Sequence, residues 1–162
     1  MSILVSQILL AVAILTTGVV YGTDVFHAIV VKKAAALSSD QSLADMMGHT
    51  HLVADKRMPL VGVSGIISTL LLSVLNYNTS LVMYSGAAFL ALILHLFIYL
   101  KVAKPINQQM SAGVVAKQMP SGIRLLQLRW DSVIAYRAIL LAVAMVSLII
   151  GAFMVGACDL VK

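Results

Sequence analysis

The sequence predicts an all-α integral membrane protein, built as one four-helix bundle in which the chain runs up, down, up and down. Hydrophobic residues make up 61% of its 162 residues and charged residues only 10%, which is not the composition of a soluble domain. A bilayer-crossing helix needs about 20 mostly apolar residues. Four stretches of this kind cover residues 3–31, 59–75, 81–100 and 132–157. Short turns between them indicate a single transmembrane domain over residues 1–162.

The first two apolar stretches also carry helix-packing signals. The first begins without a basic segment and is too long for a signal-peptide core, so we expect it to remain as a helix. Small residues recur in it at a spacing of four, as Gly18 and Gly22. Gly65 and Thr69 form the same pattern in the second stretch. Such pairs let two helices approach closely in a membrane, which supports a bundle.

The connection between the first and second stretches is expected to contain a short amphipathic helix over residues 41–56. Ser38 and Gln41 have the spacing of a capping box. A moderately apolar stripe follows, up to Pro59, which stops or kinks a helix. We expect this helix to lie at the membrane surface or beneath the bundle. The connection between the third and fourth stretches contains two prolines and two glycines and is expected to be broken into short pieces.

The positive charge of the chain predicts its orientation in the membrane. Nine of the eleven Lys and Arg residues lie in the two long connections, whereas the turn over residues 76–80 is uncharged. Because cytoplasmic loops carry an excess of Lys and Arg, both large loops are expected in the cytoplasm and both termini outside. The net charge of +5 therefore reflects topology and contact with the bilayer, and we expect no nucleic-acid partner.

Ionisable residues inside the apolar stretches are the first candidates for a site, because they are costly in a membrane. Tyr21, Asp24 and His27 follow one another at a spacing of three on one helical stripe. His95 and Tyr99 lie one turn apart in the third stretch. His27 precedes Lys32 by five positions, and His95 precedes Lys101 by six. Both histidines are therefore expected at a similar depth in the membrane. Two inward imidazoles suit a haem or a metal ion.

A third imidazole is expected from the segment "GHTHLVADKRMP". His51 and Asp55 share a helix face, while His49 points to the opposite side, so one centre takes only one of the two histidines. We favour His51, because Asp55 can orient it or join it as a metal ligand. The chain contains no glutamate, which excludes the usual di-iron bundle site. Motifs of hydrolases and nucleotide-binding enzymes are also absent from the sequence.

Two short motifs carry a resemblance to a known family. In "KPINQQM" they are Pro105 and Asn107, and in "RWDSVIAYR" they are Trp130 and Arg137. With these residues the sequence resembles the anthrone-oxygenase-like family of small bacterial and fungal membrane proteins. Ile134 stands where many members have His or Asn. The resemblance implies a four-span fold in the bacterial inner membrane and, for the named members, oxygen-dependent oxidation of an anthrone to an anthraquinone.

Two hypotheses of function follow. The first is a membrane oxidoreductase or oxygenase in which Tyr21 and Tyr99 orient a small apolar or phenolic substrate and Arg137 stabilises anionic groups. Its cofactor is a haem or a metal ion held by His27 and His95, with Asp24, His51 and Asp55 as further metal ligands or supporting groups, unless an easily deprotonated phenol reacts with oxygen directly. The second hypothesis is a non-catalytic membrane module that packs against a partner, with the histidines as hydrogen-bonding groups between helices.

Overall fold

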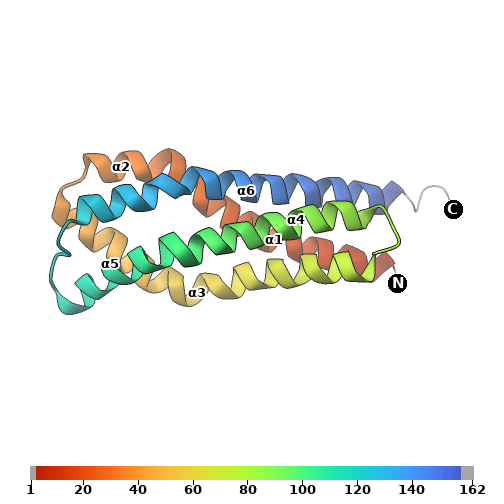
Figure 1. The fold of residues 1–162 in the computed structure, drawn as a ribbon, viewed down its shortest axis with the longest axis horizontal. Helices are drawn as coiled ribbons and strands as arrows, with labels where there is room; N and C mark the ends of the chain where they lie inside the picture. Colours follow the sequence, from red (N-terminus) through yellow and green to blue (C-terminus); the bar gives the residue numbers. More distant parts are fainter. Residues whose placement is uncertain (1–2, 158–162) are drawn as a thin grey trace. The chain divides into compact units, whose positions relative to one another are not determined.

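The computed structural model describes residues 3–157, and these residues are helical apart from short turns (Figure 1). Four helical stretches are long and apolar enough to cross a membrane. They are Ile3–Leu37, Asp40–Leu75, Leu81–Ala116 and Ile123–Val155. The predicted all-α class and the four transmembrane helices are thus confirmed. The extreme ends of the chain, whose side of the membrane was predicted from charge, lie outside the described residues.

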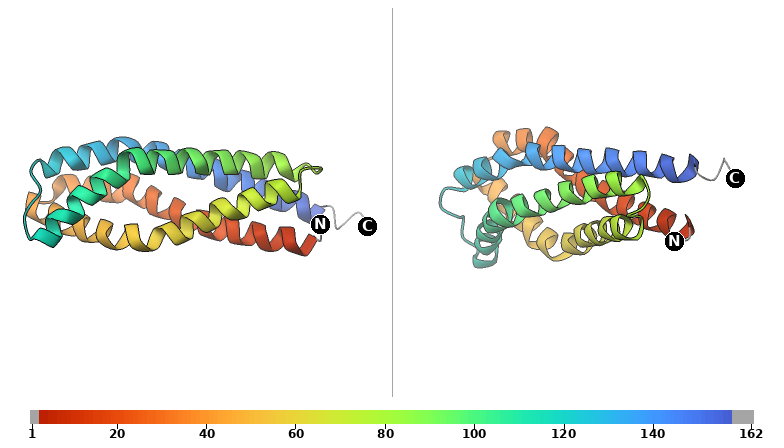
Figure 2. Two further views of the ribbon diagram at one scale, coloured as in Figure 1. Left: turned by 60° about the horizontal axis from the view of Figure 1, so that its bottom comes forward. Right: turned by 45° about the vertical axis from the view of Figure 1, so that its right-hand side comes forward.

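Each of the four stretches is one continuous run of helix or several helical elements in series. The first consists of α1 (Ile3–Phe26), the π-helical turn η1 (His27–Val31) and α2 (Lys32–Leu37). The second is α3 (Asp40–Leu75). The third consists of α4 (Leu81–Ile98), the π-helical turn η2 (Tyr99–Ala103) and α5 (Lys104–Ala116), and the fourth is α6 (Ile123–Ala157). Figure 2 shows these elements from two further sides.

Residues 41–56 do not form a helix of their own but the first part of α3, which continues through Pro59. Proline fits the φ angle of a helix, and its cost is the lost hydrogen bond and the crowding of the carbonyl four residues earlier. Packing offsets this cost, because one face of the segment is buried. The buried positions are Leu43, Ala44, Met47, Gly48 and His51.

The long connection before α6 is also more helical than expected. Pro105 lies in the first turn of α5, directly after η2, and because proline has no N–H the continuous helix lacks one backbone hydrogen bond there. The break is confined to residues 117–122. Lys117 ends α5 in the left-handed conformation with φ 54°, and Gly122 has φ 69° just before α6. Two left-handed residues are thus enough to reverse the chain.

The chain forms two compact units, which we describe separately. Unit 1 comprises Met1–Tyr21, Leu60–His95 and Ile139–Lys162, and unit 2 comprises Gly22–Pro59 and Leu96–Ala138. The buried core of unit 1 is aliphatic and includes Leu10, Leu72, Leu92, Leu141 and Leu148. The core of unit 2 includes Leu43, Met47, Ile106, Met110, Trp130 and Ile134.

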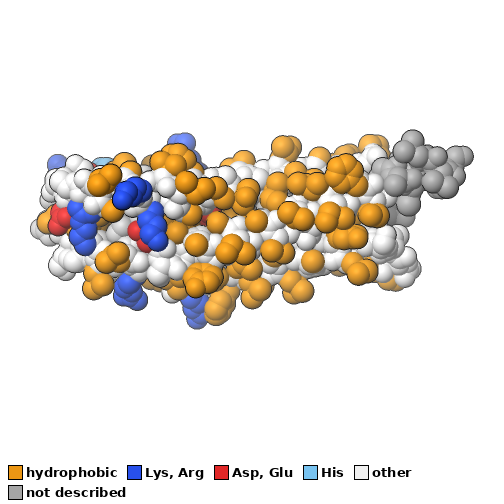
Figure 3. All heavy atoms as spheres, turned by 90° about the horizontal axis from the view of Figure 1, so that it is seen from above, with side chains coloured by type: hydrophobic (Ala, Val, Ile, Leu, Met, Phe, Trp, Pro, Cys, Tyr) orange, Lys and Arg blue, Asp and Glu red, His pale blue; other side chains and the backbone are white. Residues whose placement is uncertain are grey.

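The charged residues divide sharply between the two units. Among the described residues, unit 1 contains no Lys, Arg, Asp or Glu. Within residues 3–157, unit 2 contains ten Lys and Arg residues and five Asp residues. Figure 3 shows charged side chains gathered on one part of the visible face and hydrophobic side chains spread over the rest. Unit 1 therefore has the surface of a protein immersed in hydrocarbon.

Candidate functional site

A buried ion pair joins the first and the last helical stretches of unit 2. Arg137 on α6 donates from Nη2 to Asp24 Oδ1 on α1 at 3.0 Å. Only 8% of the Arg137 side chain and 4% of the Asp24 side chain are exposed. A lone buried charge is strongly destabilising, so each of these residues is tolerated because the other is present.

The guanidinium of Arg137 lies beside two aromatic rings. Its Cζ is 5.8 Å from the ring centroid of Tyr99 and 5.9 Å from that of Trp130. Cations at this distance are attracted to the negative faces of aromatic rings, and the attraction is stronger where water is excluded. Asp24, Tyr99 and Trp130 thus hold one permanent positive charge in a fixed place.

A chain of hydrogen bonds fixes the two aromatic residues. Trp130 Nε1 donates to Asn107 Oδ1 at 3.0 Å, and Asn107 Nδ2 donates to Asp55 Oδ1 at 2.9 Å. The Tyr99 hydroxyl donates to the same Asp55 oxygen at 2.8 Å. Asp55 on α3 therefore connects residues of η2, α5 and, through Asn107, α6. We call these residues, with Asp24, Arg137, His27 and His51, the polar cluster.

Two imidazoles pack against Trp130. The ring centroid of His27 lies 5.1 Å from that of Trp130, and the centroid of His51 lies 5.6 Å from it. His27 Nδ1 and His51 Nε2 are buried and have no hydrogen-bond partner among the residues described. Of the two histidines in the segment "GHTHL", His51 is 3% exposed while His49 is exposed. His51 is therefore the one of the two that packs inside unit 2.

Both π-helical turns begin at residues of the polar cluster. η1 begins at His27, whose carbonyl accepts a hydrogen bond from the Lys32 N–H. η2 begins at Tyr99, whose carbonyl accepts a hydrogen bond from the Lys104 N–H. Single π-turns within helices occur frequently at functional sites. For η2 the sequence supplies a cause, because Pro105 lacks the N–H that would bond to the carbonyl of Lys101. The wider turn accommodates this loss.

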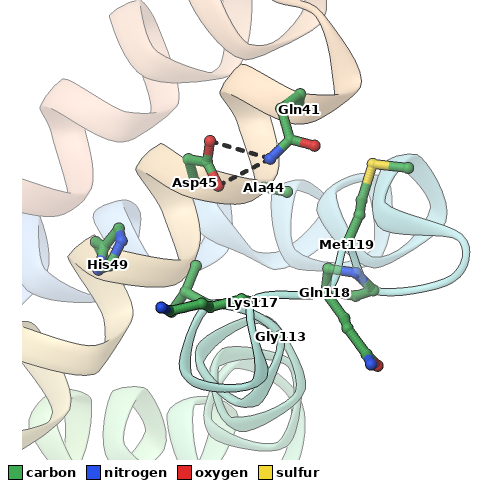
Figure 4. A pocket seen from close by; sticks show the side chains of 10 residues that line it. Gln41, Ala44, Asp45, His49, Gly113, Lys117, Gln118 and Met119 are labelled. Atoms are coloured by element: carbon green, nitrogen blue, oxygen red, sulfur yellow. Dashed lines mark hydrogen bonds between the residues drawn. The ribbon is translucent and has the colours of Figure 1, made fainter.

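A hollow of about 340 Å³ lies elsewhere in unit 2 (Figure 4). The start of α3 forms one side, where Gln41 Nε2 donates to both carboxylate oxygens of Asp45 at 3.1 Å. The end of α5 and the following turn form the other side. Exposed His49 and Lys117 also line it, whereas no residue of the polar cluster does. The hollow is lined by Gln41, Ala44, Asp45, His49, Gly113, Val114, Lys117, Gln118, Met119 and Pro120.

Most of the predicted site residues are in unit 2 and in contact with one another. Tyr21 and His95 belong to unit 1, where both are half-buried and Tyr21 packs against the aliphatic core. Pro105 is exposed and acts on the cluster only through the backbone of η2. Within residues 3–157, no group of three or more His, Cys, Asp or Glu side chains is arranged to hold a metal ion. Asp24 Oδ1 and Asp55 Oδ1 accept hydrogen bonds from protein donors instead.

Sequence reasoning did not find a second buried polar pair, Gln127 and Asp131. Gln127 Nε2 donates to Asp131 Oδ1 at 2.9 Å, and both residues are buried. Their spacing of four on a helix was the available signal. Comparisons with protein-family models, with curated proteins and with solved structures found no match to this chain.

Proposed function

We propose that the protein is an integral membrane oxidoreductase of the oxygenase type that binds a small phenolic molecule at the polar cluster. The observation that supports this best is the pair of buried imidazole nitrogens, His27 Nδ1 and His51 Nε2, which have no partner within the described chain. A buried polar atom left unpaired costs about 1–3 kcal/mol. A ligand hydroxyl that donates a hydrogen bond to such a nitrogen removes this cost, so the site favours a hydroxylated ligand.

The surroundings of the imidazoles suit the anion that a phenol forms when it loses its proton. A neutral imidazole accepts a proton as a general base. The positive charge of Arg137 acts electrostatically on both His27 and His51, so it also stabilises a phenolate that forms beside them. The rings of Tyr99 and Trp130 offer apolar faces to an aromatic ligand.

The resemblance to the anthrone-oxygenase-like family supplies the reaction of this proposal. An anthrone is the keto form of a phenol, and loss of its proton gives an electron-rich anion that oxygen oxidises directly. In the net reaction the CH₂ group loses two C–H bonds and gains one C=O bond. One oxygen atom of O₂ enters the carbonyl and the other leaves as water. The imidazole takes up the first proton and returns it to the reduced oxygen.

We also propose an arrangement of this protein in the membrane. The four helices cross a bacterial inner membrane up, down, up and down. Both termini lie outside the cell, and both long loops lie on the cytoplasmic side. The support is the distribution of Lys and Arg, because every described basic residue lies in unit 2 and the turn over residues 76–80 carries no charge. The polar cluster then lies on the cytoplasmic side.

The test measures oxygen consumption and anthraquinone absorbance with 9-anthrone as the probe, using protein purified in detergent. We expect His27→Ala and His51→Ala to lower the rate by about 10²–10⁴-fold, the usual contribution of a general base. His49→Ala is the matched control, because His49 is exposed and lies two residues from His51. It should keep the wild-type rate.

Binding is measured separately through the fluorescence of Trp130, the single tryptophan of the chain. Wild-type rates in both alanine variants would contradict the proposal, as would a wild type that neither binds nor oxidises anthrone. In that second case the histidines are hydrogen-bonding groups of a non-catalytic module. An absorption spectrum and a metal analysis of the same sample show whether the purified protein carries a cofactor.

A further inference from the structure

We propose that unit 2 carries a binding surface for the headgroups of anionic phospholipids. The surface consists of seven exposed basic side chains contributed by all four helical stretches. They are Lys32, Lys33, Lys56, Arg57, Lys101, Lys104 and Arg129, and we call them the basic belt. This inference goes beyond the proposed function and does not depend on it, because it concerns the outside of the unit rather than the polar cluster.

The acidic residues of unit 2 neutralise little of the basic belt, because in the described chain none forms an ion pair with a belt residue, although Lys32 acts electrostatically on one of them, Asp131. Asp24 pairs with Arg137, and Asp40 accepts a hydrogen bond from Arg124 at 2.7 Å. Asp131 is buried and bonded to Gln127. Unit 2 contains ten basic and five acidic residues in the described chain, which leaves a net charge of +5 with neutral histidines. This surplus lies on the belt and attracts anions.

The helical segments of unit 1 have lengths close to the thickness of the hydrocarbon core, and several belt residues stand near the ends of these segments along the chain. The helical segments of unit 1 cover residues 3–21, 60–75, 81–95 and 139–157. At about 1.5 Å per residue each is roughly 22–29 Å long, against about 30 Å for a bilayer core. On α3, Arg57 stands three residues before Leu60, and Lys101 follows His95 by six residues. Lys56, Arg57 and Lys101 thus stand within about 10 Å of such an end along the helix, at the level of the headgroups, and the other four belt residues stand roughly 13–18 Å from one.

The neighbours of the belt also fit the membrane interface. Lys101 Nζ lies 5.9 Å from the ring centroid of Phe97, so its charge stands over an aromatic face while the side chain remains exposed. Phe26 and Tyr136 are exposed at 56% and 65%, and aromatic residues gather at membrane interfaces. Leu128, next to Arg129, is exposed at 65%. Apolar and basic side chains side by side fit a phospholipid, with its tails and its phosphate, better than free phosphate.

The magnitude of the effect follows from the charge of the lipid surface. Each Lys or Arg near an anionic membrane contributes about 1 kcal/mol, and the attraction falls off within a Debye length. Neutralising one belt residue should therefore weaken binding of an anionic lipid about fivefold. The full chain, purified in detergent, is titrated with phosphatidylglycerol or with phosphatidylcholine, and bound lipid is counted by native mass spectrometry.

We expect wild-type protein to prefer phosphatidylglycerol, with a preference that declines as salt is raised. A variant with Lys56→Gln, Arg57→Gln, Lys101→Gln and Lys104→Gln should lose most of it. Lys101→Arg with Lys104→Arg keeps the charge and should bind as the wild type does. Lys117→Gln is the positional control, because Lys117 is exposed but lies in the turn after α5, outside the belt.

Three results would overturn the proposal. They are equal binding of the two lipids by the wild type, an undiminished preference in the variant that carries all four glutamines, and displacement of the lipid by inorganic phosphate at equal concentration. If the fourfold variant does not fold, the salt series on the wild type decides the matter, since a preference that ignores salt is not made by exposed charges.

Discussion

Asp24 and Arg137 show how charged residues are kept inside an apolar helix bundle. Each is almost fully buried, and their side chains meet at 3.0 Å although 113 residues separate them in the chain. The attraction across the pair must offset the loss of hydration of two charges, which is possible only with good geometry and further neighbours. Arg137 has such neighbours in the Tyr99 and Trp130 rings. The pair therefore fixes the positions of α1 and α6 within unit 2.

Removing one member of this pair should be more damaging than removing both. We expect Asp24→Ala and Arg137→Ala each to lower the free energy of unfolding by about 3–5 kcal/mol, because each leaves an uncompensated buried charge. The double variant should lose less than either single variant, because it leaves no uncompensated charge. Unfolding in a denaturing detergent, followed by circular dichroism, measures the three values, and strict additivity would show that the pair is not coupled.

Asp55 was expected beside His51 as an orienting group or a metal ligand. Its charge acts electrostatically on His51, its described hydrogen bonds come from the Tyr99 hydroxyl and the Asn107 amide, and Asn107 also accepts from Trp130. One carboxylate oxygen thus holds both rings that flank Arg137. We interpret Asp55 as a positioning residue of the polar cluster.

Replacing Asp55 should be visible in the fluorescence of Trp130. We expect Asp55→Ala to move the emission to longer wavelength, because Asn107 loses its hydrogen bond to Asp55 and Trp130 becomes more mobile and more exposed to water. Tyr99→Phe removes one of the two donors and should have a smaller effect. Asp45→Ala, which removes an exposed carboxylate from the same helix, is the control. An identical spectrum in Asp55→Ala and wild type would contradict the positioning role.

At the scale of the elements, the apolar stretches were predicted well, but the full lengths of the helices that contain them were not. Hydropathy detects the part of a helix that faces lipid, so it predicted spans ending near residues 31 and 100. The helices continue to Leu37 and Ala116, because polar segments also become helical when one face packs in a core. Residues 41–56 show this directly, since their stripe of buried positions extends α3 rather than starting a separate helix.

Close approach of α3 and α5 depends on a glycine in this extended part. A Cβ atom on Gly48 would stand 2.5 Å from Val114 Cγ1 and 2.9 Å from the Met110 carbonyl oxygen. We therefore expect Gly48→Ala to destabilise the protein by about 1–3 kcal/mol through overpacking. Gly62→Ala on the same helix meets nothing within 4 Å and should stabilise by about 0.5–1 kcal/mol. Melting temperatures in one detergent compare the two variants, and a Gly48→Ala protein as stable as Gly62→Ala would contradict the close contact.

At the scale of the whole molecule, every residue of the polar cluster was predicted as a site residue, Asn107 and Trp130 through the family resemblance, but the pairing of these residues was not predicted. Depth and helical spacing selected Asp24, His27 and His51, since both can be counted along the chain. The partners of these residues come from distant segments, and no local pattern indicates that Arg137 meets Asp24. The concentration of Lys and Arg in the long connections was visible in the sequence, but the boundaries of the two units that separate charged from uncharged segments came only from the structure.

The orientation of the molecule is open to a direct test by cysteine labelling. In a Cys158→Ser background, which removes the only native cysteine, Asn78→Cys and Gln108→Cys each introduce one exposed thiol. A membrane-impermeant maleimide applied to intact cells should label position 78 and not position 108, because basic segments stay in the cytoplasm. Labelling of position 108 alone would reverse the proposed topology.

The two π-turns determine how the sequence of this chain must be aligned with that of any helix bundle that lacks such turns. A π-turn holds one residue more than an α-helical turn, so every side chain after it is rotated by about 100° about the helix axis. Lys32–Leu37 and Lys104–Ala116 therefore present faces that an unbroken helix would direct elsewhere. A relative without these turns needs a one-residue gap in each of the two helices. An alignment without gaps there would pair Asn107 with the wrong position, and its hydrogen bonds to Trp130 and Asp55 would be assigned to a neighbour.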